Sequence, residues 1–295
     1  MKNSVALGID IGGSHITAAL VDLKTGSLLE GSRQRKYVRS DEAAEIILDH
    51  WCGVIREVFK SGTGLQKNIG IAMPGPFDYK AGISLIRDQD KFRTLYQVNI
   101  KTELARRLNI KEQEIRFIND AAGFLQGEVF GGAARNFSRV IGLTLGTGLG
   151  AAFCANGQAT DAALWNAKFK EGIAEDYLST RWFIKRYFEL TGHTIAGVKE
   201  LDLSTGRSPE IKKMFGEFAH HLGQFIHMVV QQQDADLIVL GGNISNAYPC
   251  FLPELEQEFQ KYPIPAKVKI AELKEDAALI GAASLWGRLE TAELK

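Results

Sequence analysis

Cysteine is scarce in this sequence of 295 residues, and its distribution excludes two classes of small protein. The three cysteines, Cys52, Cys154 and Cys250, lie far apart, so they form neither a C-x-x-C metal motif nor a disulfide framework. We expect them to be small buried side chains in a protein of the cytoplasm, where thiols stay reduced.

The sequence also lacks net charge and long apolar runs. Lysine plus arginine and aspartate plus glutamate both number 35, so no global field would attract nucleic acid or an anionic membrane. A basic run at residues 33–39 lacks interleaved aromatic residues and is typical of an exposed strand or loop. No apolar run is long enough to span a bilayer, and VALGIDIGG follows the first residues directly, so we expect no secretory leader.

The sequence contains two copies of one pattern, a strand, a glycine-rich turn and a second strand. Residues 5–9 alternate as a strand does, the glycine-rich stretch DIGGSH follows, and ITAALVD returns as a second strand. Residues 140–145, the turn Gly146-Thr147-Gly148 and LGAAFCA repeat that order. Two glycine-rich hairpins can arise by chance, but a duplicated lobe explains both at once. Backbone N–H groups in such turns bind anions, so both hairpins are expected to hold phosphate.

The second hairpin also contains a match to the dinucleotide fingerprint G-x-G-x-x-G/A. That fingerprint requires a helix after the glycines, with its N-terminus directed at a pyrophosphate. Here the run after Gly148 ends after seven residues at Asn156-Gly157, a strong tight-turn pair, so we predict a strand. The pattern therefore argues against a nicotinamide-dependent dehydrogenase.

The remaining segments alternate between helix and strand, which indicates an α/β protein. Helices are predicted at residues 41–60, 100–108, 173–190 and 211–233, near 246 and at 276–289. Strands are predicted at residues 68–74, 115–119, 237–242 and 268–273.

Five motifs in this order resemble the ROK family of sugar kinases and repressors, within the actin, hexokinase and Hsp70 superfamily. They are DIGGSHITAALVD at residue 10, FIND at 117, LGTGLG at 145, LGGN at 240 and DAALIGAA at 276. The resemblance implies two ribonuclease-H-like lobes that close on a sugar and on ATP with Mg²⁺. We expect a smaller lobe of residues 1–118 plus 279–295 and a larger lobe of residues 119–278.

The resemblance also assigns the cofactor-binding residues. Asp10 would orient the magnesium ion through water, and three turns would bind ATP: Gly12, Gly13 and Ser14; Thr147 and Gly148; and Gly241, Gly242 and Asn243. For Gly241 and Gly242, an ordinary turn at the end of a strand is an equally good interpretation.

Asp120 matches the catalytic base of the family, which deprotonates the sugar hydroxyl that attacks the γ-phosphate. Its place at the start of a helix agrees with this role, because the helix dipole favours an ionised carboxylate. An aspartate here can also be a simple N-cap.

On the sugar side we expect contacts from Asn119, Gly75, Lys91 and Glu175. Glu175 lies in EGIAEDYLS, which resembles a family segment with the pattern G-C-x-E-x-x-x-S, although an exposed glutamate in a first helical turn would look the same. Ile173 replaces the family's zinc-binding cysteine, so no zinc site is expected. Packing of Ile173, Tyr177 and Trp182 is expected to hold the segment instead.

The sequence therefore predicts an ATP-dependent kinase that phosphorylates a hexose, with the 6-hydroxyl of glucose or a related hexose as the leading acceptor. N-acetylglucosamine or N-acetylmannosamine is the alternative acceptor, and a non-catalytic, sugar-responsive regulator is the alternative function. The expected partners are the sugar, ATP and a second copy of the chain in a homodimer.

Overall fold

A computed structural model describes residues 4–60, 62, 67–89, 91–201 and 208–287. The chain divides into two compact units, which are treated separately below. The first unit comprises Met1–Asn136, Gly157–Thr160 and Glu275–Lys295, and the second comprises Phe137–Asn156 and Asp161–Lys274.

The first unit is built on a mixed sheet with the strand order β3-β2-β1-β5-β8, and β4 also pairs with β2. Strands β1 and β2 are antiparallel, whereas β1, β5 and β8 run parallel to one another. The strands are β1 Val5–Ile11, β2 His15–Asp22, β3 Ser27–Leu28, β4 Gln34–Tyr37, β5 Ile69–Met73 and β8 Ile115–Asn119. A separate small hairpin joins β6 Phe77–Asp78 to β7 Ile83–Ser84.

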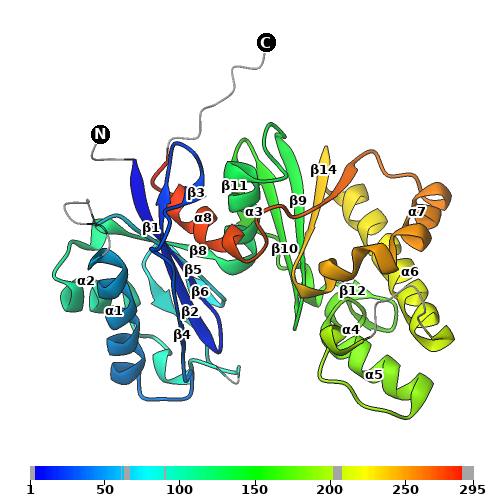
Figure 1. Ribbon diagram of the computed structural model, residues 1–295, viewed down its shortest axis with the longest axis horizontal. Coiled ribbons are helices and arrows are strands. Elements are labelled where there is room, and N and C mark those ends of the chain that lie inside the picture. The colour runs from blue at the N-terminus through cyan, green and yellow to red at the C-terminus, as the bar shows by residue number, and fades with distance from the viewer. Residues whose placement is uncertain (1–3, 61, 63–66, 90, 202–207, 288–295) are drawn as a thin grey trace. The chain divides into compact units, whose positions relative to one another are not determined.

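Helices cover both faces of this sheet (Figure 1). Helices α1, Ala44–Lys60, and α2, Ile100–Leu108, lie on one side, where Trp51 of α1 is fully buried. On the other side α8, Ala277–Ser284, packs on β1 and β5 and against α3, Asp120–Gly131. Apolar strands covered on both faces explain why β5 is buried at every position.

The second unit repeats this arrangement of strands. Its antiparallel pair, β9 Arg139–Leu145 and β10 Leu149–Ala155, is followed by β14, Leu237–Gly241, and β15, Lys267–Ile270, both parallel to β9. Strand β11, Gln158–Asp161, pairs with β10. The two hairpins and the α/β class predicted from the sequence are therefore confirmed.

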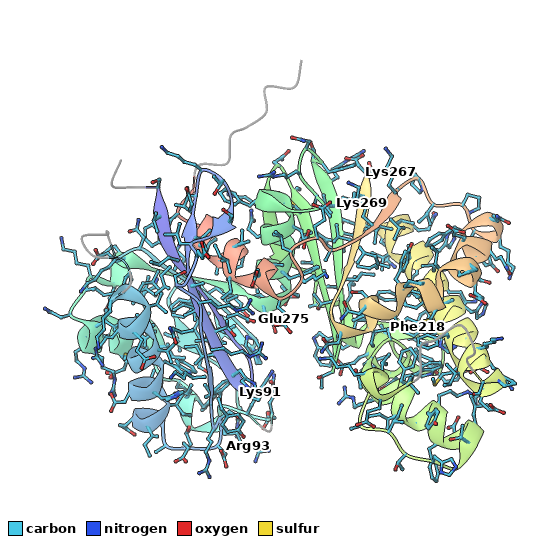
Figure 2. The ribbon with its side chains drawn as sticks, in the orientation of Figure 1. Lys91, Arg93, Phe218, Lys267, Lys269 and Glu275 are labelled. Atoms are coloured by element: carbon cyan, nitrogen blue, oxygen red, sulfur yellow. The ribbon has the colours of Figure 1, made fainter. Side chains whose placement is uncertain are left out.

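Helices of the second unit are α4 Ala174–Tyr177, α5 Thr180–Thr191, α6 Pro209–Gln232 and α7 Leu252–Lys261. Helix α6 carries the centre of the core, where Phe218 is fully buried (Figure 2). The short strands β12, Lys168–Phe169, and β13, Gly172–Ile173, precede α4.

Two predicted helices were wrong in their limits. The helix expected at residues 173–190 is interrupted, because β13 and the short α4 precede a new helix that starts at Thr180. The helix expected near residue 246 is a 3-10 segment, Asn243–Cys250, and α7 begins only after it. Pro249 inside that segment has no N–H to donate, which disfavours an α-helix there.

The lobe limits expected from the sequence stay a prediction. The compact units divide the chain at different positions, since α3 groups with the first unit through its packing on α8. No helix within the described residues is long and apolar enough to cross a membrane.

Candidate active site

The first glycine turn, residues 12–14, connects β1 to β2 and exposes backbone donors. The N–H of Gly12 donates to the carbonyl oxygen of His15 at 2.9 Å and closes the turn. The N–H groups of Gly13 and Ser14 donate to no acceptor within the described part of the chain. Two free N–H groups in one turn form an anion-binding concavity.

Lys91 lies beside this turn. A Cβ atom added to Gly13 would lie 3.2 Å from Cδ of Lys91, so the lysine stem packs on the glycine. Figure 2 shows Lys91 near the end of the β1–β2 hairpin. The structure thus places a cation, expected from the sequence on the sugar side, at the first turn.

Asp10 precedes the turn, opposite Thr17 of β2 and Ala72 of β5. Burial raises the pKa of its carboxyl to about 7, and the negative charge of Asp120 is the next contribution. The charge of Arg35 acts in the opposite direction, while Glu275 adds a smaller increase. Asp10 and Asp120 are therefore brought close enough to repel each other.

Asp120 is the first residue of α3, and its side chain is exposed. The N-cap is Asn119, whose side-chain oxygen accepts a hydrogen bond from the N–H of Ala122 at 3.1 Å. The Asp120 carboxylate accepts from the N–H of Ala121 at 2.9 Å. Because Asn119 supplies the cap, the simple N-cap interpretation of Asp120 was wrong.

Tyr79 connects two of the residues expected to bind sugar. The side-chain amide of Asn119 donates to the Tyr79 hydroxyl at 3.2 Å, and a Cβ atom on Gly75 would lie 3.2 Å from the same oxygen. The Tyr79 hydroxyl in turn donates to the carbonyl oxygen of Met73 at 3.2 Å. No sequence pattern pointed to Tyr79, because its role depends on contacts between segments that are separate in the chain.

The second glycine turn, residues 146–148, connects β9 to β10. The N–H of Gly146 donates to the carbonyl oxygen of Gly148 at 3.1 Å, and the N–H groups of Thr147 and Gly148 have no acceptor within the described residues. Glu175 lies against this turn, and its Oε2 accepts from the N–H of Leu149 at 3.0 Å.

A pocket of about 280 Å³ adjoins this turn in the second unit. It brings together Thr147 and Asn243, both expected at the nucleotide site, and it is also lined by Thr180, Ile244 and residues 196–200. Gly242 has a φ of +83°, and a Cβ atom there would overlap the backbone of Leu145. Gly242 is thus required by the turn at the end of β14, and that turn also places Asn243 at the pocket.

Asp10 and Asp120 supply two carboxylates of the type that binds a magnesium ion together with phosphate oxygens. Within the described residues no group of three or more His, Cys, Asp or Glu could hold a metal ion. Magnesium at phosphoryl-transfer sites is usually bound by one or two carboxylates together with phosphate oxygens and water. A cation would also relieve the repulsion that contributes to the raised pKa of Asp10.

Comparison with known sequences gives a match to the ROK family over residues 6–162 and 170–288. The chain is 23% identical to an N-acetyl-D-glucosamine kinase of Mannheimia succiniciproducens, over 95% of this chain and 98% of that protein. It is 24% identical to a glucokinase of Thermotoga maritima, over 95% and 96% of the two chains.

Comparison with solved structures shows the same fold. A ROK hexokinase from Thermus thermophilus matches with a TM-score of 0.76 and 20% identity, over 95% of this chain and 96% of that chain. A ROK glucokinase from Streptomyces griseus, in complex with glucose and AMPPNP, matches with a TM-score of 0.69 and 23% identity, over 95% and 98%. A ROK transcriptional regulator matches with a TM-score of 0.77 and 18% identity, over 96% of this chain and 77% of that chain.

Proposed function

This chain belongs to the ROK family, and we propose that it is a kinase that transfers the γ-phosphate of ATP to a hydroxyl group of a sugar. The observation that carries the proposal is the pair of carboxylates, Asp10 and Asp120, beside the first glycine turn. Relatives named as sugar kinases and a family member with bound glucose and AMPPNP support the same reaction.

In this proposal Asp120 is the general base. Its carboxylate is exposed at the start of α3, and the N–H of Ala121 holds one of its oxygens. The Asp120 carboxylate would accept the proton of the sugar hydroxyl as the hydroxyl oxygen bonds to the γ-phosphorus. Asn119, Gly75 and Lys91 would orient the sugar, with Tyr79 fixing the Asn119 amide.

The phosphate groups are assigned to the two glycine turns. The N–H groups of Gly13 and Ser14 and those of Thr147 and Gly148 are free to donate to phosphate oxygens. Asp10 would orient Mg²⁺, which when bound neutralises charge on the phosphoryl oxygens. Asn243 and Gly241-Gly242 are assigned to the adenosine side, where the pocket at Thr147 has room for part of a nucleotide.

The acceptor we propose is the 6-hydroxyl of glucose or a related hexose, with an N-acetylhexosamine as the second candidate. The relatives support both, since they include a glucokinase and an N-acetylglucosamine kinase. We retain Glu175 as a sugar contact by resemblance, and the homodimer and the cytoplasmic location as predictions.

A panel of sugars tests this proposal. Purified protein with ATP and magnesium should release ADP in the presence of at least one hexose or N-acetylhexosamine. Replacement of Asp120 by asparagine should remove that activity. If no sugar elicits ADP release while sugars still bind, a sugar-responsive regulator becomes the better interpretation, and the similarity to a regulator supports that second candidate.

A further inference from the structure

The start of α5 and the short helix α4 hold the second glycine turn through three hydrogen bonds, and an ion pair supports one of them. The N–H and the hydroxyl of Thr180 both donate to the carbonyl oxygen of Gly146, each at 2.8 Å. Oε2 of Glu175 accepts from the N–H of Leu149 at 3.0 Å, and Oε1 of the same carboxylate pairs with Arg181.

The side chain of Glu175 packs directly on the second glycine turn. Its side chain is 17% exposed, and a Cβ atom added to Gly148 would overlap its Oε2. Arg181 is 68% exposed and reaches the carboxylate from the first turn of α5. Arg181, on the solvent side, therefore holds the Glu175 carboxylate in place. The carboxylate in turn holds the end of the glycine turn through the N–H of Leu149.

We propose that Glu175 and Arg181 are positioning residues for the second turn, which they hold in the conformation that receives the phosphates of the nucleotide. The inference rests on the proposed function for the identity of that ligand. A carboxylate offers about four acceptor positions, so the two contacts described leave positions for a sugar hydroxyl. No sugar contact is assigned to Arg181, so its substitution isolates the effect on the turn.

Calorimetry with a non-hydrolysable ATP analogue tests the proposal. Arg181→Gln should weaken analogue binding about two- to fivefold, because exposed ion pairs contribute little individually. Glu175→Ala should weaken it about tenfold or more, because the N–H of Leu149 loses an acceptor in a poorly solvated place. Sugar binding measured without nucleotide should be unchanged in Arg181→Gln, and Arg181→Lys should restore most of the analogue affinity.

Lys185→Gln is the matched control. Lys185 lies one turn later on α5 and is 79% exposed, and among the described residues it pairs only with Glu189, at 3.9 Å. Its loss should therefore leave analogue binding unchanged. Equal analogue affinities in Arg181→Gln and Lys185→Gln would overturn the role of Arg181. A loss confined to sugar binding in Glu175→Ala would overturn the role of Glu175.

Gly148→Ala provides a second route to the same contact. The added methyl group should displace the Glu175 carboxylate, so the variant should resemble Glu175→Ala in analogue affinity. The double variant Gly148→Ala/Glu175→Ala should then bind no more weakly than the weaker single variant. Additive losses would mean that the two residues act independently and would contradict the proposal.

Amide hydrogen exchange separates this inference from the proposed function. In the protein alone, Arg181→Gln and Glu175→Ala should speed exchange at the N–H of Leu149, and Lys185→Gln should not. If the wild-type protein binds no ATP analogue, the proposed function fails while this exchange still decides the positioning role. Unchanged exchange at Leu149 in both variants would overturn it.

Discussion

At the scale of single residues, the pKa of Asp10 links the stability of the protein to pH. Burial and the charge of Asp120 raise this pKa from 3.8 to about 7. The folded protein therefore binds a proton that the unfolded chain releases near pH 3.8. Protonation of Asp10 therefore makes its full contribution to the free energy of unfolding below pH 3.8. This contribution is lost as the pH rises from 3.8 to about 7.

We expect the replacement Asp10→Asn to remove this pH dependence, because an amide resembles the neutral carboxyl and does not titrate. In magnesium-free buffer the wild-type protein should lose stability relative to Asp10→Asn as the pH rises from about 5 to about 8. Urea unfolding of both proteins across this range measures the effect. Parallel pH profiles would show that Asp10 titrates normally.

Replacement of the other carboxylate, Asp120→Asn, should lower turnover about 10²- to 10⁴-fold, because the general base is lost. Affinity for the ATP analogue should not fall. The same change should lower the pKa of Asp10, since it removes the neighbouring negative charge. Steady-state kinetics and carboxyl NMR titration check the two effects, and wild-type kcat with the best sugar would refute the assignment of Asp120.

At the scale of secondary-structure elements, glycines decide how closely α8 approaches its neighbours. Cβ atoms on Gly8 of β1 and Gly70 of β5 would overlap carbonyl oxygens of α8. A Cβ atom on Gly281 of α8 would likewise overlap the carbonyl oxygen of Gly123 in α3. These contacts are between backbones, so no side chain can move aside to accept a larger residue. The motif DAALIGAA is therefore explained by packing, quite apart from any ligand.

We expect Gly281→Val to destabilise the protein by about 3 kcal/mol or more, because the overlap can be relieved only by shifting a helix. Gly53→Ala is the control: Gly53 lies within α1, and a Cβ atom there would meet nothing within 4 Å. That change should stabilise the protein by up to about 1 kcal/mol. Chemical unfolding of both variants gives the comparison, and equal stabilities would contradict it.

At the scale of the whole molecule, the sequence predicted what depends on local pattern. Strand alternation and glycine turns located both hairpins, and apolar periodicity located α1, α2 and α6. The interruption between α4 and α5, just before Thr180, was not predictable from the sequence. It accompanies hydrogen bonds from Thr180 to Gly146, which is 34 positions away in the chain. The contact of Tyr79 with Asn119 was missed for the same reason.

The stability of the protein should also be independent of zinc. Tyr177 and Trp182 pack edge-on against His221, with ring centroids 5.1 and 5.4 Å apart. Burial lowers the pKa of His221 to about 4, which keeps the ring neutral at neutral pH. Ile173 is half-buried and is not among the apolar residues that pack in this core.

Elemental analysis should therefore find no stoichiometric zinc in the purified protein. Activity lost to EDTA should return with magnesium alone, because we expect side-chain packing to hold residues 168–182. In a zinc-dependent fold a chelator would lower the unfolding temperature, since metal affinity contributes to folding. A requirement for added zinc would contradict this prediction.

The place of α8 in the chain has a consequence for the order of events during synthesis. Strands β1 and β5 leave the ribosome early, but the helix that covers Gly8 and Gly70 is made only after the whole second unit. At a synthesis rate of about 5–20 residues per second, α8 is made on the order of ten seconds or longer after these strands. In that interval the second unit can fold while one face of the first sheet is still open to water. The nascent chain should accordingly depend on chaperones at the N-terminal sheet, the part that is made first and completed last.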